Sequence, residues 1–175
     1  MLYHASEQAG IRELIPQIST HGKRYVYAMN SRLTALLFGA PKDDFDILVD
    51  EAEGKPVIHE CYPDALQKVY RGKSCSLYEV REDGFLSGQT GWDSELVCEH
   101  SVPVAAEERI ENIYDEIADA IQSGACAFHA HSKDAGYQDF LREELSERIR
   151  DFGLTDAQMN ADPRFKLYFH ELLEK

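Results

Sequence analysis

The sequence predicts an α+β fold with a strand-rich body, residues 1–105, and a C-terminal helical segment, residues 106–175, packed on that body. Up to about Val104, short apolar or alternating runs rich in Val, Ile, Tyr and Phe are broken by Pro, Gly or Asp, which is typical of strands. After Ala105, apolar residues recur every three or four positions, as in amphipathic helices. The 175 residues, 43% of them hydrophobic, suffice for one sizeable core.

The expected strands of the body share β-branched and aromatic residues between turn-forming residues. They are Tyr25–Ala28, Phe45–Val49, Val57–Cys61, Ser76–Val80 and Glu95–Val104, and Leu2 with Tyr3 starts a further edge strand. One helix interrupts this series. Asn30 or Ser31 can cap it, and Gly39 followed by Pro41 ends it.

The C-terminal segment contains three expected helices. The first carries a stripe of isoleucines and ends at Gly124; the stripe is Ile110, Ile113, Ile117 and Ile121. The second runs from about Tyr137 to Phe152 and ends at Gly153. The third begins at Asp162 as N-cap, with Pro163 at the first helical position.

The charge of the chain limits its partners. With 18 Lys and Arg against 32 Asp and Glu, the net charge is −14, which repels a polyphosphate backbone and argues against non-specific nucleic-acid binding. A small anionic ligand in a local pocket remains compatible with this charge. No apolar run approaches the roughly 20 residues that span a bilayer, and no secretion leader begins the chain, so we expect a cytoplasmic protein without a membrane partner.

The cysteines and the common catalytic motifs narrow the chemistry further. Cys61, Cys75, Cys98 and Cys126 form no CxxC pair and have no metal-ligand spacing, so we expect reduced, mostly buried thiols and no metal site. The sequence contains no GxxxxGK[ST], GxGxxG, GxSxG or HExxH motif. P-loop phosphoryl transfer, Rossmann dinucleotide chemistry and the usual serine hydrolases therefore have no support.

Three short stretches carry the most functional information. They are Tyr3-His4-Ala5-Ser6 at the first strand, Tyr25-Val26-Tyr27-Ala28 before a helix, and Glu95-Leu96-Val97 opening a late strand. In this order they resemble the His-Tyr-Glu branch of the ADP-ribosyltransferase fold, the branch of diphtheria toxin and the poly(ADP-ribose) polymerases. The resemblance covers about the first 105 residues and implies a split, mostly antiparallel sheet.

The resemblance also implies a reaction and a set of site residues. NAD would be the substrate, its nicotinamide–ribose bond would be cleaved, and ADP-ribose would pass to an acceptor, either a protein or a small molecule. His4 and Ser6 would bind NAD, and Tyr25 or Tyr27 would stack on the nicotinamide. Glu95 would be catalytic, because a carboxylate near the ribose stabilises an oxocarbenium-like transition state.

Two features of these stretches leave a second function open. Ala5 stands where the family has a glycine, and the paired tyrosines leave it open which ring stacks. The alternative is a catalytically inactive binding module on the same fold. Taken singly, His4 is equally an ordinary strand-end residue, the tyrosines are core aromatics, and Glu95 is a solvated charge.

The histidine pair in FHAH, residues 128–131, provides a third and weaker hypothesis. His129 and His131 could hold a metal in a hydrolase if a third ligand came from elsewhere in the chain. No third ligand has a recognisable spacing, so we interpret the stretch as a linker between two helices.

Overall fold

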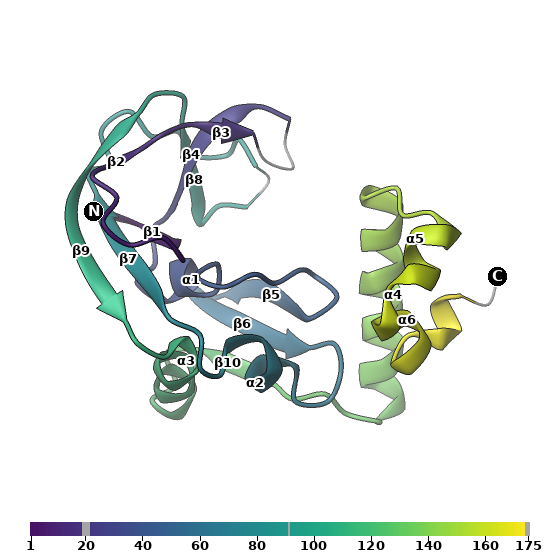
Figure 1. Cartoon of the computed structure of the whole chain (residues 1–175). Coiled ribbons are helices and arrows are strands. Elements are labelled where there is room, and N and C mark those ends of the chain that lie inside the picture. Colours follow the sequence, from purple (N-terminus) through teal and green to yellow (C-terminus); the bar gives the residue numbers. More distant parts are fainter. Residues whose placement is uncertain (19–21, 91, 174–175) are drawn as a thin grey trace. The chain divides into compact units, whose positions relative to one another are not determined.

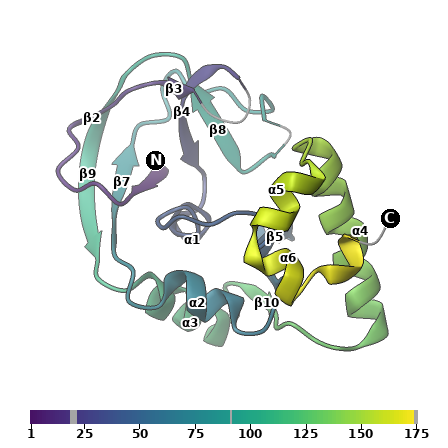
Figure 2. The same ribbon diagram turned by 45° about the vertical axis from the view of Figure 1, so that its right-hand side comes forward.

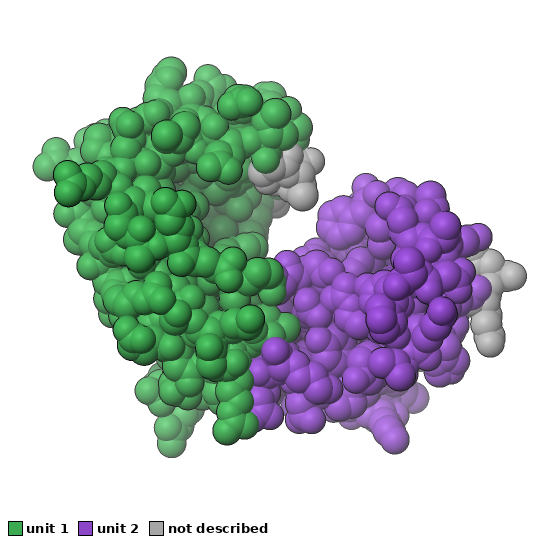
Figure 3. All heavy atoms as spheres, viewed as in Figure 1, with its two compact units in different colours: residues 1–41, 69–126 green, residues 42–68, 127–175 purple. Residues whose placement is uncertain are grey.

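The computed structural model describes residues 1–18, 22–90 and 92–173. The fold is mixed α and β, with mostly antiparallel sheets. The chain forms two compact units, residues 1–41 with 69–126 (unit 1) and residues 42–68 with 127–175 (unit 2), coloured separately in Figure 3. This division differs from the expected boundary at residue 105, because residues 42–68 belong to the same unit as the C-terminal residues 127–175.

Unit 1 is built on a seven-stranded sheet within the described residues (Figure 1). Its strands follow the order β2-β9-β7-β1-β4-β3, and β8 also pairs with β4; every pairing is antiparallel. The bounds are β1 (Leu2–Ser6), β2 (Glu13–Leu14), β3 (Gln17–Ile18), β4 (Arg24–Met29), β7 (Cys75–Val80), β8 (Glu95–Cys98) and β9 (Val102–Ile110).

Alternate side chains of these strands form the unit 1 core. The buried cluster comprises Leu2, Leu14, Val26, Ala28, Val80, Leu96, Cys98 and Val102. Helix α1 (Arg32–Leu36) lies against β1, β4 and β7, and the Ser31 hydroxyl caps it by accepting from the Thr34 amide at 3.3 Å. Gly39 follows at a close approach, since a Cβ there would lie 2.7 Å from Cys75 Sγ. Helix α3 (Ile113–Gln122) buries Ile113 and Ile117.

Unit 2 contains a three-stranded sheet and the C-terminal helices. Strands β5 (Ile47–Ala52) and β6 (Lys55–Glu60) form a hairpin, and β10 (Ala127–His129) pairs parallel to β6. Glu53 and Gly54 both have positive φ, as a two-residue type I′ turn requires. Helices α5 (Asp156–Ala161) and α6 (Pro163–Leu167) lie along α4 (Ala135–Asp151) in both ribbon views (Figures 1 and 2). The helix α2 (Ala65–Tyr70) contains the point where the chain passes into unit 1.

A buried carboxylate joins three parts of unit 2. Glu60 is 6% exposed, and its Oε1 accepts from the Leu66 amide of α2 at 2.9 Å. Its Oε2 accepts from the His131 amide, just beyond β10, at 3.2 Å. The Glu60 side chain therefore satisfies two backbone donors, one in α2 and one just beyond β10.

The aromatic and charged contacts of α6 hold it to the segment before β5. The Phe165 ring lies 5.2 Å from that of Phe45 between centroids. The Arg164 guanidinium contacts Asp43, Asp46 and Asp162 at 2.7, 2.8 and 2.6 Å. Because Asp162 is also the N-cap of α6, accepting from the Arg164 amide at 2.8 Å, one carboxylate both starts the helix and orients its arginine.

Several expected elements differ in the structure. The expected strand Glu95–Val104 is two strands, β8 and β9, separated by residues 99–101. Ile110 ends β9, so the first C-terminal helix begins only at Ile113. The FHAH linker contributes β10, and α2, β2 and β3 were not expected. The Asp162-Pro163 helix start and the Ser31 cap are confirmed.

The four cysteines are buried and free. Within residues 1–18, 22–90 and 92–173, no helix has the length and apolar character needed to cross a bilayer.

Replacing Glu60 should destabilise the chain strongly. In Glu60→Ala, two buried amides lose their acceptor, and we expect the free energy of unfolding to fall by about 3 kcal/mol. Glu60→Gln keeps one acceptor oxygen and should lose less. Urea denaturation measures both, with the exposed Glu143→Ala as the matched control. Equal losses of unfolding free energy in Glu60→Ala and Glu143→Ala would show that Glu60 does not stabilise the fold through these two hydrogen bonds.

Candidate functional site

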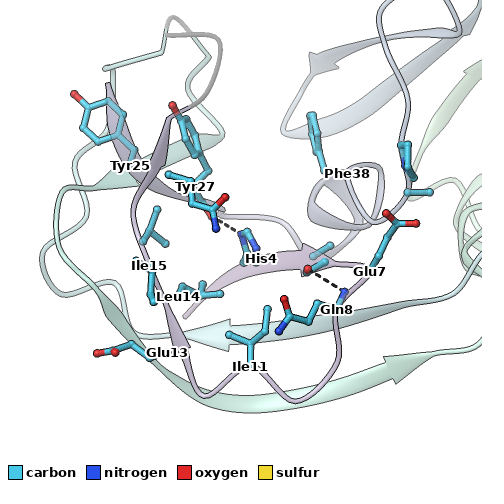
Figure 4. Close-up of a pocket in the computed structure, with 16 residues that line it drawn as sticks. His4, Glu7, Gln8, Ile11, Glu13, Leu14, Ile15, Tyr25, Tyr27 and Phe38 are labelled. Carbon is cyan, nitrogen blue, oxygen red and sulfur yellow. Dashed lines mark hydrogen bonds between the residues drawn. The ribbon is translucent and has the colours of Figure 1, made fainter. Parts of the chain in front are cut away.

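The predicted binding residues of the first two stretches line one cavity in unit 1. His4, Ser6, Tyr25 and Tyr27 all contribute to a cavity of about 560 Å³. This volume lies within the roughly 300–1,000 Å³ of small-molecule sites. Figure 4 shows His4 on β1 and Tyr25 and Tyr27 on β4, with Ile11, Leu14 and Ile15 from the segment between these strands.

The cavity lies where β1 and β4 part. Within the described residues, β1 pairs with β7 along its whole length, from Leu2 with Val80 to Ser6 with Ser76. Its pairing with β4 is confined to Tyr3 with Met29. Beyond this pair β4 takes β3 as its neighbour, with Gln17 opposite Tyr25. The cavity is therefore lined by residues of β1 and β4 where these two strands are no longer paired.

His4 spans this gap and has a defined tautomer. Its Nδ1 lies 2.8 Å from the carbonyl oxygen of Tyr27. Because a carbonyl oxygen only accepts, Nδ1 carries the proton and donates it, and Nε2 of the neutral ring is an acceptor. Burial lowers the pKa of His4 below its usual 6.5, against the opposing effect of the hydrogen bond to Tyr27. At neutral pH His4 therefore presents an uncharged ring with an acceptor nitrogen.

The two tyrosines differ in exposure. Tyr25 is 4% exposed and meets Tyr27 edge to face, with centroids 5.9 Å apart and planes at 85°. Tyr27 is half-buried. Figure 4 shows both rings projecting from the same side of β4. Since Tyr25 has little free surface, Tyr27 is the ring with a face for a ligand, and Tyr25 supports its edge.

Glu95 lies on the neighbouring strand and outside the described lining of this cavity. The register of β8 on β4 places Glu95 opposite Met29 and Val97 opposite Tyr27. Directly opposed residues of an antiparallel pair share a face of the sheet, so Glu95 is on the face of Met29 and Tyr27. The strands of the three predicted stretches are thus consecutive neighbours, in the order β1, β4, β8.

The cavity includes residues that the sequence did not single out. Glu7 and Gln8 follow directly after Ser6, and the Gln8 amide donates to the Ser6 hydroxyl at 3.2 Å. Glu13 and Gln17 lie at the cavity's β2–β3 side. Phe38, 42% exposed, contributes an aromatic ring from the end of α1. An aromatic residue between the expected helix and Gly39 is the sequence signal that could have indicated this wall.

The remaining candidates are less well supported. A second cavity in unit 1, of about 600 Å³, includes Arg81, Cys98 and His100 but none of the predicted site residues among its described lining. In unit 2, His129 lies opposite His59 in register and stacks on it at 4.5 Å between centroids. Within the described parts of the chain, no three His, Cys, Asp or Glu side chains are grouped as metal ligands.

Comparison of the chain with protein-family models, with curated proteins and with solved structures finds no match.

The lowered pKa of His4 predicts a pH dependence of stability. A histidine whose pKa is lower in the folded than in the unfolded state stabilises the fold above pH 6.5, and this stabilisation is lost as pH falls below that value. His4→Gln removes the titration and keeps an N–H donor for Tyr27. The unfolding free energy of the parent should therefore drop more between pH 7.5 and pH 5 than that of His4→Gln. Parallel profiles from urea denaturation would contradict this assignment.

Proposed function

We propose that this protein is an ADP-ribosyltransferase-like protein that binds NAD in the cavity between β1 and β4 and cleaves its nicotinamide–ribose bond. One observation carries the proposal. His4, Ser6, Tyr25 and Tyr27, chosen from two stretches about 20 residues apart, line the same cavity. Within each strand the two residues are two positions apart and share a face, and the two pairs meet where β1 and β4 are no longer paired.

Each residue has a chemical task in this proposal. His4 Nε2 accepts a hydrogen bond from a ribose hydroxyl, in the tautomer that the Tyr27 carbonyl fixes. The Tyr27 ring stacks on the nicotinamide, and Ser6 donates its hydroxyl proton to a polar group of the ligand. These contacts hold NAD in one orientation, which lowers the entropic cost of reaching the transition state.

Glu95 is the proposed catalytic carboxylate. Cleavage of the glycosidic bond develops positive charge on the ribose, and a carboxylate stabilises this charge. Glu95 lies on the strand next to that of Tyr27, opposite Met29. ADP-ribose would then pass to water or to an acceptor, either a protein or a small molecule.

A second function is favoured by the position of Glu95. Because Glu95 is outside the described lining of the cavity, the same cavity could serve a binding module that holds the ligand without cleaving it. Ala5, which lines the cavity in place of the family's glycine, agrees with this alternative. Binding and turnover separate the two functions.

The first experiment measures nicotinamide release from NAD by the purified full chain. We expect release by the parent and a loss of about a hundredfold in turnover in Glu95→Gln, because the charge is removed while the shape is kept. Glu99→Gln removes the same charge from an exposed residue just beyond β8 and serves as the control. Unchanged turnover in Glu95→Gln would show that the Glu95 carboxylate has no catalytic role. Binding of NAD without any release would establish the binding module.

The second experiment measures NAD affinity by calorimetry. We expect His4→Gln, which loses the acceptor nitrogen, and Tyr27→Leu, which loses the ring, each to weaken binding by about tenfold. Tyr27→Phe keeps the ring and should bind nearly as the parent does. Thermal unfolding of each variant shows whether the fold is intact. Full affinity in a folded Tyr27→Leu would contradict stacking on this ring.

A further inference from the structure

The charged side chains among the described lining residues of the cavity are of one sign. Among its described lining residues, the ionised side chains are the carboxylates of Glu7 and Glu13. His4 is neutral and presents an acceptor, as the preceding geometry shows. Apart from the hydroxyls of Ser6, Tyr25 and Tyr27 and the amides of Gln8 and Gln17, the polar side-chain groups of the lining are Glu7, Glu13 and His4 Nε2, which only accept hydrogen bonds.

A pyrophosphate needs the opposite arrangement. Proteins bind phosphates with arginine, lysine or converging backbone N–H groups. The Nζ of Lys23 lies 5.9 Å from the centroid of the Tyr25 ring, but Lys23 is not part of the described lining. The net charge of −14 adds a general repulsion toward anionic ligands.

The same lining suits a cationic base that carries hydroxyl groups. A positively charged ring is attracted to the aromatic faces of Tyr27 and Phe38 and to nearby carboxylates. Ribose hydroxyls donate to acceptors such as His4 Nε2. In Figure 4, His4 is drawn between Tyr27 on one side and Glu7 and Phe38 on the other.

We infer that the cavity recognises the cationic nicotinamide riboside half of its ligand, through its positive charge and its hydroxyl groups, and does not recognise the phosphates. This inference rests on the proposed function, because it assigns the ligand of the same cavity. It makes a phosphate-free cationic nucleoside at least as good a ligand as the dinucleotide. It also makes the oxidised, cationic ring a better ligand than the reduced, neutral ring.

The test compares four ligands with the full chain by calorimetry: nicotinamide riboside, nicotinamide mononucleotide, NAD and the reduced riboside. We expect the riboside to bind as tightly as NAD within about threefold, or more tightly, and the reduced riboside to bind at least about tenfold more weakly. Raising the salt concentration should leave NAD affinity unchanged or improve it, because salt screens repulsion of the phosphates.

Two variants sharpen the test. Glu7→Gln should weaken the riboside about threefold to tenfold and affect NAD less, whereas the exposed Glu53→Gln in the β5–β6 turn should change neither. Lys23→Ala should leave the ratio of riboside to NAD affinity unchanged. A loss of NAD affinity alone in Lys23→Ala would show that a phosphate is recognised and would overturn the inference.

The outcomes separate this inference from the proposed function. NAD binding at least ten times tighter than riboside binding overturns the inference and leaves the proposed function standing. Riboside binding without nicotinamide release supports the inference and rejects the enzyme in favour of the binding module. Failure of all four ligands to bind overturns both.

Discussion

The hydrogen bond from His4 Nδ1 to the carbonyl oxygen of Tyr27 is the constraint on which the candidate site depends. It replaces a ladder bond at the place where β1 stops pairing with β4, so that the two strands stay close without closing the sheet. A continued antiparallel ladder would fill this space with strand backbone and leave no cavity. The same bond fixes the protonated nitrogen, and the chemistry offered by the ring follows from that choice.

The rest of unit 1 holds the two sides of this gap in place. β1 is paired with β7 at all five of its residues, so it cannot follow β4 when the strands part. β4 in turn is held by β8 from Val26 to Met29 and by β3 at its first residues. Leu2, Val26 and Ala28 are in one buried cluster, which anchors both strands to the same core. Pairing on the outer sides therefore holds the two strands apart, and the His4–Tyr27 hydrogen bond joins them across the gap.

The sequence predicted the parts of this fold that depend on local chemistry. Ser31 and Asp162 carry short acceptor side chains that cap a helix wherever the chain allows one, and both do so. The sequence could not reveal β2, β3 or β10, since two or three residues provide no periodicity and these strands exist only through their partners. The expected strand Glu95–Val104 is interrupted at residues 99–101, whereas Pro103, which has no N–H, lies inside β9 opposite Glu13. Likewise, Ile110 fits the helical spacing of the isoleucines that follow it, but its pairing with Cys75 keeps it in β9.

The site shows the same division between local and long-range information. The order of the three motifs predicted that His4, Tyr27 and Glu95 belong to one site. In the structure their strands are consecutive neighbours in one sheet. Whether three side chains share a cavity depends on the register and the splay of the strands, which a motif does not encode. The His4 side chain reaches the Tyr27 carbonyl because β1 and β4 are not paired beyond Tyr3 and Met29. In contrast, β8 stays paired with β4 as far as Glu95, which lies opposite Met29. Glu95 lies on the face of Tyr27, whereas the pairing of Tyr3 with Met29 places His4 on the other face of β1. Whether Glu95 reaches a ligand that His4 binds is therefore the feature that separates an enzyme from a binding module on this fold.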